Sequence, residues 1–243
     1  MMKLILTLVT LMYFNVVFPQ KLKFKNPFFE AFVLRIHPEI DTNNNGKIER
    51  PEAALLKNLA IKGADLTVVD DIKAFENLEV LFLPSNVLSQ LTLSDFKYLQ
   101  ELYCTWGKLT KLEIKNMPQL KFIGCGSNKL EKVSIINCPN LESLNLESNQ
   151  ITSLDVSTFK KLNSLLLGDN KLNSLDLSNN PELIQFLIYN NNIKEIDITN
   201  NQKLKMNMLY IDNQVKIIGT PDQMKNYRKN EPVREASPVI RQQ

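Results

Sequence analysis

The apolar residues of this chain recur with a fixed period of twenty-one positions. Each unit opens on a leucine, and no unit gains or loses a residue between the first opening leucine and the last. The opening residues are Leu78, Leu99, Leu120, Leu141, Leu162, Leu183 and Leu204. Six units in phase predict stacked supersecondary units that share one continuous core.

Each unit contains two short stretches with the spacing of buried strands. Apolar residues stand at offsets 0, 3, 5, 10, 13 and 15 from the opening leucine, as in the unit that begins at Leu141. Alternate side chains of a strand point to the same side, so the first half predicts a strand that stacks into a parallel sheet. The second half repeats the first, which predicts extended structure on the other side of each coil as well. We therefore expect a repeat solenoid that is mainly β.

The first half of the unit resembles the leucine-rich repeat family. Its motif L-x-x-L-x-L-x-x-N runs, for example, from Leu162 to Asn170. The doubled spacing resembles the nested-period bacterial repeats of the IRREKO type. This resemblance implies a solenoid of parallel β-strands, flatter than one backed by helices, that serves as a binding scaffold.

Asparagines and cysteines occupy fixed places in the unit. An asparagine at offset 8 is expected to hydrogen-bond the backbone of adjacent coils, although Gly107 interrupts this column and Asp212 ends it. The column contains Asn86, Asn128, Asn149, Asn170 and Asn191. Cys104 and Cys125 share offset 5 in consecutive units, so they either pack as buried thiols or form a disulfide. Cys138 is expected to be a free thiol.

The period also divides the chain into segments. These are an N-terminal cap over 21–55, a divergent unit over 56–77, six regular units over 78–203, a terminal unit over 204–212 and a closing region over 213–243. The cap is expected to begin with a short amphipathic helix from Asn26 to Ile36. In the terminal unit, Asn207 stands at a core position. The closing region is expected to form a last strand, one helical turn and a flexible tail.

Residues 1–20 have the features of a secretory signal peptide. Lys3 is followed by a nearly unbroken apolar run from Leu4 to Phe18. About 15 apolar residues suit a signal peptide better than a membrane span, which needs roughly 20. The alternative is an uncleaved anchor. We predict a signal peptide over 1–20, export to the medium or the surface of a bacterial cell, and no stable membrane span after its removal.

The cap carries an oxygen-rich loop over residues 41–52. The loop matches D-x-[DN]-x-[DN]-G-x5-E at every constrained position, and Gly46 permits the sharp turn. It resembles an EF-hand loop, which implies calcium. The implied ligands are Asp41, Asn43, Asn45, the carbonyl of Lys47, Glu49 and Glu52. Three carboxylates and a single loop predict weak, structural calcium binding; the alternative is an Asn/Gly turn that binds no metal.

Large outward-facing residues predict a contact surface on the first sheet. They are Phe82, Tyr103, Trp106, Phe122, Leu187, Tyr189 and Tyr210. Exposed aromatic clusters are typical of protein-binding hot spots. The alternative is that the N-terminal cap covers them. On the opposite side, the stacked residues Asp155, Asp176 and Asp197 are expected to cap local turns.

Composition and charge narrow the function further. The chain has 29 Lys+Arg against 26 Asp+Glu, and a net charge of +3 is too small to favour nucleic acid or a membrane surface. His37 is the only histidine and lies far in sequence from the cysteines, so no catalytic His-containing site can be assembled. We expect a non-enzymatic binding module for a protein or a glycan. The alternative is a calcium-stiffened structural spacer. The arrangement also resembles internalin-like and Bacteroidetes surface proteins, which implies adhesion.

Overall fold

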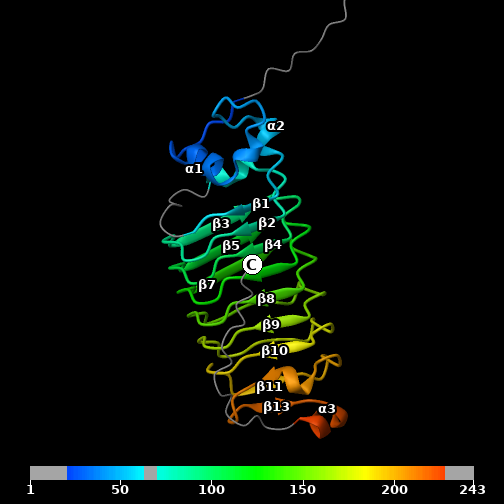
Figure 1. Cartoon of the computed structure of the whole chain (residues 1–243). Coiled ribbons are helices and arrows are strands. Elements are labelled where there is room, and N and C mark those ends of the chain that lie inside the picture. Colours follow the sequence, from blue (N-terminus) through cyan, green and yellow to red (C-terminus); the bar gives the residue numbers. More distant parts are fainter. Residues whose placement is uncertain (1–20, 63–69, 228–243) are drawn as a thin grey trace, which may run out of the picture.

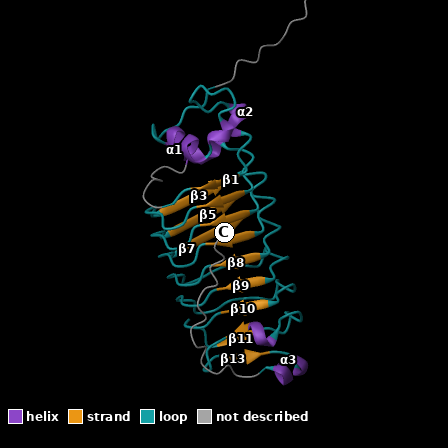
Figure 2. Ribbon diagram, in the orientation of Figure 1, coloured by secondary structure: helices purple, strands orange, loops and turns teal. Residues whose placement is uncertain are grey.

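The computed structural model describes residues 21–62 and 70–227 as an elongated solenoid whose coils stack in chain order (Figure 1). Helices lie near its two ends and strands fill the length between them (Figure 2). The expected mainly β repeat solenoid is confirmed. The predicted signal peptide over 1–20 and the tail beyond 227 lie outside the described residues. Within the described ranges, no helix is long and apolar enough to cross a membrane.

The first face is one parallel sheet of eight strands. Its strands, in spatial order, are β1 (Asn58–Ala60), β2 (Val80–Phe82), β4 (Glu101–Tyr103), β6 (Phe122–Gly124), β8 (Ser143–Asn145), β9 (Ser164–Leu166), β10 (Gln185–Leu187) and β12 (Leu209–Tyr210). The register advances by one repeat period per coil in the regular units, so Leu81 pairs with Leu102 and Leu144 pairs with Leu165. The central residue of each three-residue strand, and Leu209 of β12, are buried because they point into the coil.

The last coil departs from the regular register. Phe186 pairs with Leu209, a step two residues longer than the repeat period, because the short helical turn η4 (Met206–Met208) holds the extra residues. Asn207 is exposed in that turn, and Leu209 fills the core position instead. The expectation from the sequence that Asn207 occupies the core is therefore wrong, because two extra residues shift the core position to Leu209.

The second face is a sheet in some coils only. The strands β3 (Gln90–Ser94), β5 (Lys111–Lys115) and β7 (Lys132–Ile136) form a parallel three-stranded sheet. Near the far end, β11 (Glu195–Asp197) pairs with β13 (Lys216–Ile218). In the two coils between these sheets, residues 153–157 and 174–178 form no strand. Extended pairing on both sides of every coil is thus confirmed in part.

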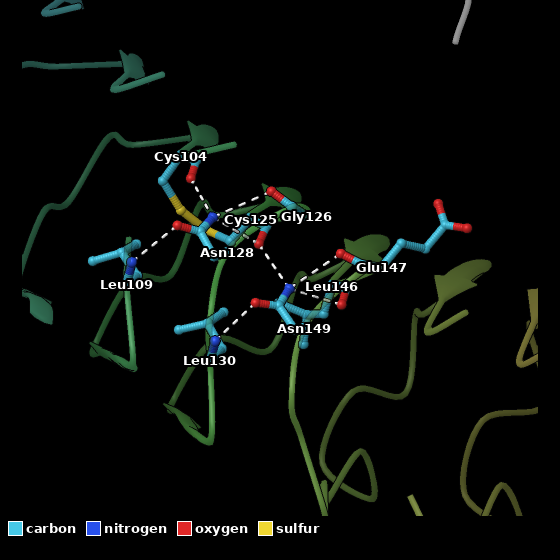
Figure 3. The surroundings of a disulfide bond; sticks show 9 residues. All are labelled: Cys104, Leu109, Cys125, Gly126, Asn128, Leu130, Leu146, Glu147 and Asn149. Atoms are coloured by element: carbon cyan, nitrogen blue, oxygen red, sulfur yellow. Dashed lines mark hydrogen bonds between the residues drawn. A yellow bond between two sulfur atoms is a disulfide. The ribbon is translucent and has the colours of Figure 1, made fainter. Parts of the chain in front are cut away.

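Buried asparagines join the coils along the first column. The Oδ1 of Asn149 accepts the N–H of Leu130 at 2.9 Å, and its Nδ2 donates to the carbonyls of Cys125 and Leu146 at 3.1 and 2.9 Å. Asn128 and Asn170 make the same pattern one coil away on either side. Figure 3 shows how the amides reach from one coil to the next. The predicted structural role of the column is confirmed.

Cys104 and Cys125 form a disulfide between consecutive coils, with their Cα atoms 4.6 Å apart (Figure 3). They replace core residues such as Leu83 and Leu146 of the flanking coils, and both cysteines are buried. Cys138 is free and buried, and burial raises the pKa of its thiol. The structure therefore selects the disulfide over two buried thiols.

The N-terminal cap packs its aromatic residues against the first coils. It contains α1 (Phe29–Ile36), η1 (Pro38–Ile40) and α2 (Arg50–Ala53), and η3 (Asp70–Ala74) follows in the divergent unit. The Phe29 ring lies 6.2 Å from that of Phe75 between centroids. The buried Asp71 side chain accepts the backbone N–H groups of Lys25 and Asn26 at 2.6 and 2.8 Å. These contacts seal the open end of the core.

A short helix closes the opposite end. The helix α3 (Pro221–Asn226) begins at a capping box in which Thr220 and Gln223 bond each other's backbone N–H groups. The Nε2 of Gln223 also donates to the carbonyls of Ile198 and Asn201 at 2.9 and 3.2 Å. The predicted last strand and helical turn are therefore both present, and Gln223 supplies donors for the carbonyls of the last regular unit, 183–203.

Candidate calcium loop and binding face

The loop over 41–52 is wound around its first carboxylate. Asp41 accepts the N–H of Asn45 on Oδ1 at 3.0 Å and the N–H of Gly46 on Oδ2 at 2.9 Å. Gly46 has a φ of +70°, and Asn44 has a φ of 55°. Glycine enters this left-handed region at no steric cost, which explains why the turn carries Gly46.

Two buried glutamates close the loop. Glu52 accepts the N–H of Thr42 on Oε1 and the N–H of Glu49 on Oε2, both at 3.0 Å, so it joins the two ends of the loop. Glu49 accepts the side-chain amides of Asn43 and Asn45 at 3.2 and 2.8 Å. Hydrogen bonding with the Glu52 side chain, and then with Asn45, lowers the pKa of Glu49.

The donor set suits a hard cation that prefers oxygen ligands. Within the described residues, no three His, Cys, Asp or Glu side chains converge as a metal site, so the carboxylates alone do not form one. The loop adds the amides of Asn43 and Asn45, which point their nitrogens at Glu49 here. Their oxygens accept the backbone N–H groups of Asn45 and Lys47 at 3.0 and 2.8 Å, so they would reach an ion only if these two turns rearranged. The residues present therefore fit calcium only as a mixed carboxylate and amide set.

Other contacts tie the loop to the rest of the cap. Glu30 of α1 accepts the N–H of the buried residue Ile48 at 2.8 Å. Its second oxygen pairs with Lys47 Nζ at 3.2 Å, so the Lys47 side chain points away and only its carbonyl remains a candidate ligand. Lys21 and Glu49 form an isolated antiparallel bridge. Any change in the loop is therefore passed to α1 and to the start of the cap.

Three of the predicted contact residues form an aromatic row on the first sheet. The Tyr103 ring lies between Phe82 and Phe122, at centroid distances of 5.6 and 4.7 Å. These residues come from β2, β4 and β6 in successive coils. The Tyr103 hydroxyl donates to Glu101 Oε2 at 2.7 Å. Burial by its neighbours, and then this hydrogen bond, raise the pKa of Tyr103 to about 12.

The cap leaves this aromatic row accessible. Phe82 remains 39% exposed, whereas the aromatic residues that the cap covers are Phe29 and Phe75, at 3% and 0%. Trp106 is 57% exposed and lies in the turn after β4, at a φ of 55°, rather than on the sheet. The alternative that the cap covers these residues is therefore wrong for Phe82 and Trp106.

The remaining predicted contact residues lie about four coils farther along. Leu187 and Tyr210 are paired neighbours on β10 and β12. Tyr189 donates its hydroxyl to Glu147 Oε1 at 2.9 Å, two coils back. Its ring passes over Gly168, where an added Cβ would lie 2.5 Å from the ring. The seven predicted residues thus form two separate patches.

The stacked aspartates of the second face cap turns, as predicted. Asp155 and Asp176 accept the N–H groups of Ser157 and Ser178 at 2.9 and 2.8 Å. Asp197 accepts the N–H of Thr199 at 2.8 Å. Hydrogen bonds from these Ser and Thr residues lower the pKa of all three carboxyl groups.

The repeat is also visible in comparison with known proteins. A protein family that is described as leucine-rich repeats in two copies matches residues 118–161. The functional domain of InlJ from Listeria monocytogenes, described as including a cysteine ladder, has a TM-score of 0.52 at 22% identity. The match covers 74% of this chain and 44% of that one. The fold is the leucine-rich repeat fold.

Two further solved structures are similar to this chain. The LRIM1 leucine-rich repeat domain has a TM-score of 0.52 at 16% identity, covering 77% of this chain and 71% of that one. An internalin C2 from L. monocytogenes has a TM-score of 0.49 at 19% identity, over 81% of this chain and 94% of that one. No curated protein matches the chain. The match covers less than half of the length of the InlJ domain. Leucine-rich repeat folds are typically binding scaffolds.

Sequence reasoning missed the carboxylates that support these sites. Glu30 and Glu101 are ordinary surface residues in the sequence, and nothing marks them as partners of Ile48 and Tyr103. Glu147 stands 42 residues before Tyr189. That separation is twice the repeat period, so the period itself was the available signal for this pair.

Proposed function

We propose that this chain is a non-enzymatic binding module, exported to the medium or the cell surface, that recognises a protein partner through its first sheet. The observation that carries the proposal is the aromatic row of Phe82, Tyr103 and Phe122, which the cap leaves uncovered beside the exposed Trp106. Rigid aromatic side chains supply large contact areas at small entropic cost and dominate protein interfaces. A broad sheet face suits such contacts better than catalysis.

The binding proposal is tested with the double variant Phe82→Ala/Trp106→Ala. The immobilised chain is exposed to host or culture-medium proteins, and the captured proteins are identified and purified. We expect the double variant to weaken binding of a purified partner at least tenfold, because hot-spot residues contribute roughly 1–2 kcal/mol or more each. Tyr98→Ala is the matched control, since Tyr98 is 50% exposed but lies outside the row.

Trp106 gives this test a second readout. It is the only tryptophan in the chain, so a change in tryptophan emission on adding a non-fluorescent partner fragment reports on this face directly. Equal binding by the double variant and the control would place the contact elsewhere. Capture that glycosidase treatment of the partner abolishes would identify a glycan instead, and self-association alone would favour a structural spacer.

We also propose that calcium bound by the loop over 41–52 stabilises the cap. The proposal is supported by the buried residues Glu49 and Glu52 and by the oxygen-rich set around them. Asp41, Glu49, Glu52, the two amides and the Lys47 carbonyl would hold the ion, which would offset the charge of the three carboxyl groups. Loop closure would then fix Ile48 against α1.

The calcium proposal is tested by thermal unfolding with calcium and with a chelator. A site with a Kd of about 1 mM would add roughly 1.4 kcal/mol at about 10 mM calcium. We expect Glu52→Gln to remove this gain, because glutamine lacks the negative charge that attracts calcium. Glutamine still accepts part of the hydrogen bonding that the Glu52 oxygens accept. Glu182→Gln is the control, since Glu182 is a carboxylate in the far half of the array that pairs with Lys203 and makes no contact with the loop. An unchanged melting temperature and no calcium heat in titration calorimetry would contradict the proposal.

A further inference from the structure

The strand β7 has an open edge in the middle of the second face. It is the last strand of the sheet formed with β3 and β5. Among the described residues, no backbone hydrogen bond joins 131–137 to 152–158 in the next coil. Just before this stretch the coils are joined, since the N–H of Gln150 donates to the carbonyl of Leu130 at 2.9 Å. One edge of β7 therefore presents backbone N–H and C=O groups that do not pair with the next coil.

A hollow of about 850 Å³ lies along this open edge. Its walls include the apolar residues Val133, Ile135 and Leu154, all of which are half-buried. The residues at the equivalent places of the preceding coil, Leu112 and Ile114, are 0% and 1% exposed. Val133 and Ile135 are therefore not covered by a neighbouring strand, whereas Leu112 and Ile114 are covered.

The shape of the hollow restricts what can fill it. Leu154 and Thr158 of the next coil line its far side. The edge of a second folded copy would bring its own following coil and would collide with this wall. A single extended segment, free on both sides, can add to the strand and fill the hollow by β-augmentation.

The sequence of the chain contains a segment with matching chemistry. Residues 228–243 lie outside the described part, and their sequence is RKNEPVREASPVIRQQ. It carries four basic residues and two acidic ones, and it includes the β-branched pair Val239 and Ile240 followed by Arg241. The hollow offers apolar walls together with Asp95 and Asp155, against the single lysine Lys97 of its lining.

Three exposed aspartates lie on the surface between α3 and the hollow. Asp155, Asp176 and Asp197 present one carboxylate per coil on this face, and all three are exposed. They follow the path that a basic segment would take from the far end of the solenoid to β7. Opposite charge along this path favours the segment over an acidic peptide.

The segment is long enough to reach. Four coils separate β13 from β7, which amounts to about 19 Å at roughly 4.8 Å per coil. The stretch from 228 to 238 spans up to about 36 Å when extended. That length exceeds the axial distance and leaves slack for crossing the face.

We propose that Val239, Ile240 and Arg241 dock in the hollow beside β7, with the two apolar side chains against Val133 and Leu154 and Arg241 near Asp155. The chain then covers its own open strand edge with its C-terminal segment. This proposal concerns the second face and does not depend on the proposed function. It also assigns a binding place to a segment that the sequence alone predicts to be a flexible tail.

The test is amide hydrogen exchange of a chain that includes residues 21–243. We expect Val239→Asp/Ile240→Asp to speed exchange at residues 132–137 at least tenfold and to leave β4 unchanged. Gln242→Asp/Gln243→Asp adds the same charge beyond the anchor and serves as the control. Arg241→Glu, which alters charge alone, should give a smaller acceleration at the same residues.

Three results would overturn the proposal. Equal exchange at 132–137 in the wild type and the anchor variant would show that the segment does not cover β7. Protection of residues 132–137 from exchange that weakens on dilution, together with a dimer in light scattering, would show that the docked segment belongs to a second copy of the chain. Protection lost equally in the control variant would show a general charge effect instead of docking.

Discussion

At the scale of single residues, the side chains that hold the contact face are fixed by partners in other coils. Tyr189 reaches Glu147 across two coils, and its ring lies on the bare backbone of Gly168. Tyr103 is held by a hydrogen bond to Glu101 and by the rings of Phe82 and Phe122, between which it lies. The aromatic face is thus preorganised, which lowers the entropic cost of binding.

The pair of Glu147 and Tyr189 predicts a pH-dependent contribution to stability. Burial raises the pKa of Glu147, so the folded state disfavours its ionisation. The favourable contribution is present below the ordinary value of 4.5 and is lost as pH rises through the raised pKa. Glu147→Gln keeps an acceptor for Tyr189 and cannot ionise. We therefore expect it to stabilise the chain at pH 7 by a few tenths to about 1 kcal/mol and to lose that advantage near pH 3.

Urea denaturation at pH 7 and pH 3 measures this difference. Glu142→Gln is the matched control, because this half-exposed glutamate stands just before β8 in the same unit. A gain at pH 3 equal to that at pH 7 would contradict the assignment of the effect to ionisation of Glu147.

Single residues also show how far the sequence could be trusted. The asparagine column was predictable because a polar residue recurred among buried leucines, and buried amides require partners. The loop over 41–52 could be singled out because its spacing is confined to one short stretch of sequence, and its binding of calcium stays a prediction. Glu101 and Glu30 could not be found, since their partners depend on how coils and cap pack.

At the scale of elements, the disulfide replaces core packing by a covalent link between coils. Cys104 and Cys125 have a sequence separation of 21, and a closed loop of that size is worth roughly 3 kcal/mol through the unfolded state. We expect a reductant to lower the free energy of unfolding by about that amount. Cys104→Ala/Cys125→Ala should be less stable than the oxidised wild type and insensitive to reductant.

Chemical denaturation with and without reductant checks this prediction, with mass spectrometry to confirm the redox state. Cys138→Ala is the control, because the free thiol contributes packing but no cross-link. An oxidised wild type no more stable than the reduced one would show that the link adds nothing to the fold.

The second-face strands show where local pattern stops deciding structure. The apolar spacing is the same in all coils, yet residues 153–157 and 174–178 form no strand. Asp155 and Asp176 bond the chain two residues on, which competes with ladder pairing. Asp197 makes the same turn after β11, and there β13 still pairs with the strand. Neighbouring coils therefore decide, and the sequence of one unit could not have located the open edge of β7.

At the scale of the whole molecule, the solenoid is a one-dimensional array in which each coil contacts mainly its neighbours. The cap seals one end through Phe29, Phe75 and Asp71, and Gln223 bonds carbonyls of the last regular unit, 183–203. Both closures were predicted in outline, because an array must cover its terminal core. Their atomic form was not, because it depends on side chains outside the repeat.

This linear arrangement predicts that equal core substitutions act differently along the array. Leu144 and Leu209 occupy the same buried column, both with 0% exposure, in a central coil and in the last strand of the sheet. Replacing either by alanine should cost about 2–5 kcal/mol locally. Leu209→Ala should loosen only the last coil, because few neighbours depend on it. Leu144→Ala should weaken the coupling between the two halves and separate their unfolding.

Hydrogen exchange resolved along the chain distinguishes these outcomes. For Leu209→Ala we expect faster exchange in residues 185–218 and unchanged protection in β2 and β4. For Leu144→Ala we expect faster exchange on both sides of β8 and a broader denaturation transition with a lower m-value, the sign of lost cooperativity. Uniform loss of protection in both variants would mean that the array unfolds as one cooperative unit. In that case the end closures would stabilise the central coils as strongly as the terminal ones.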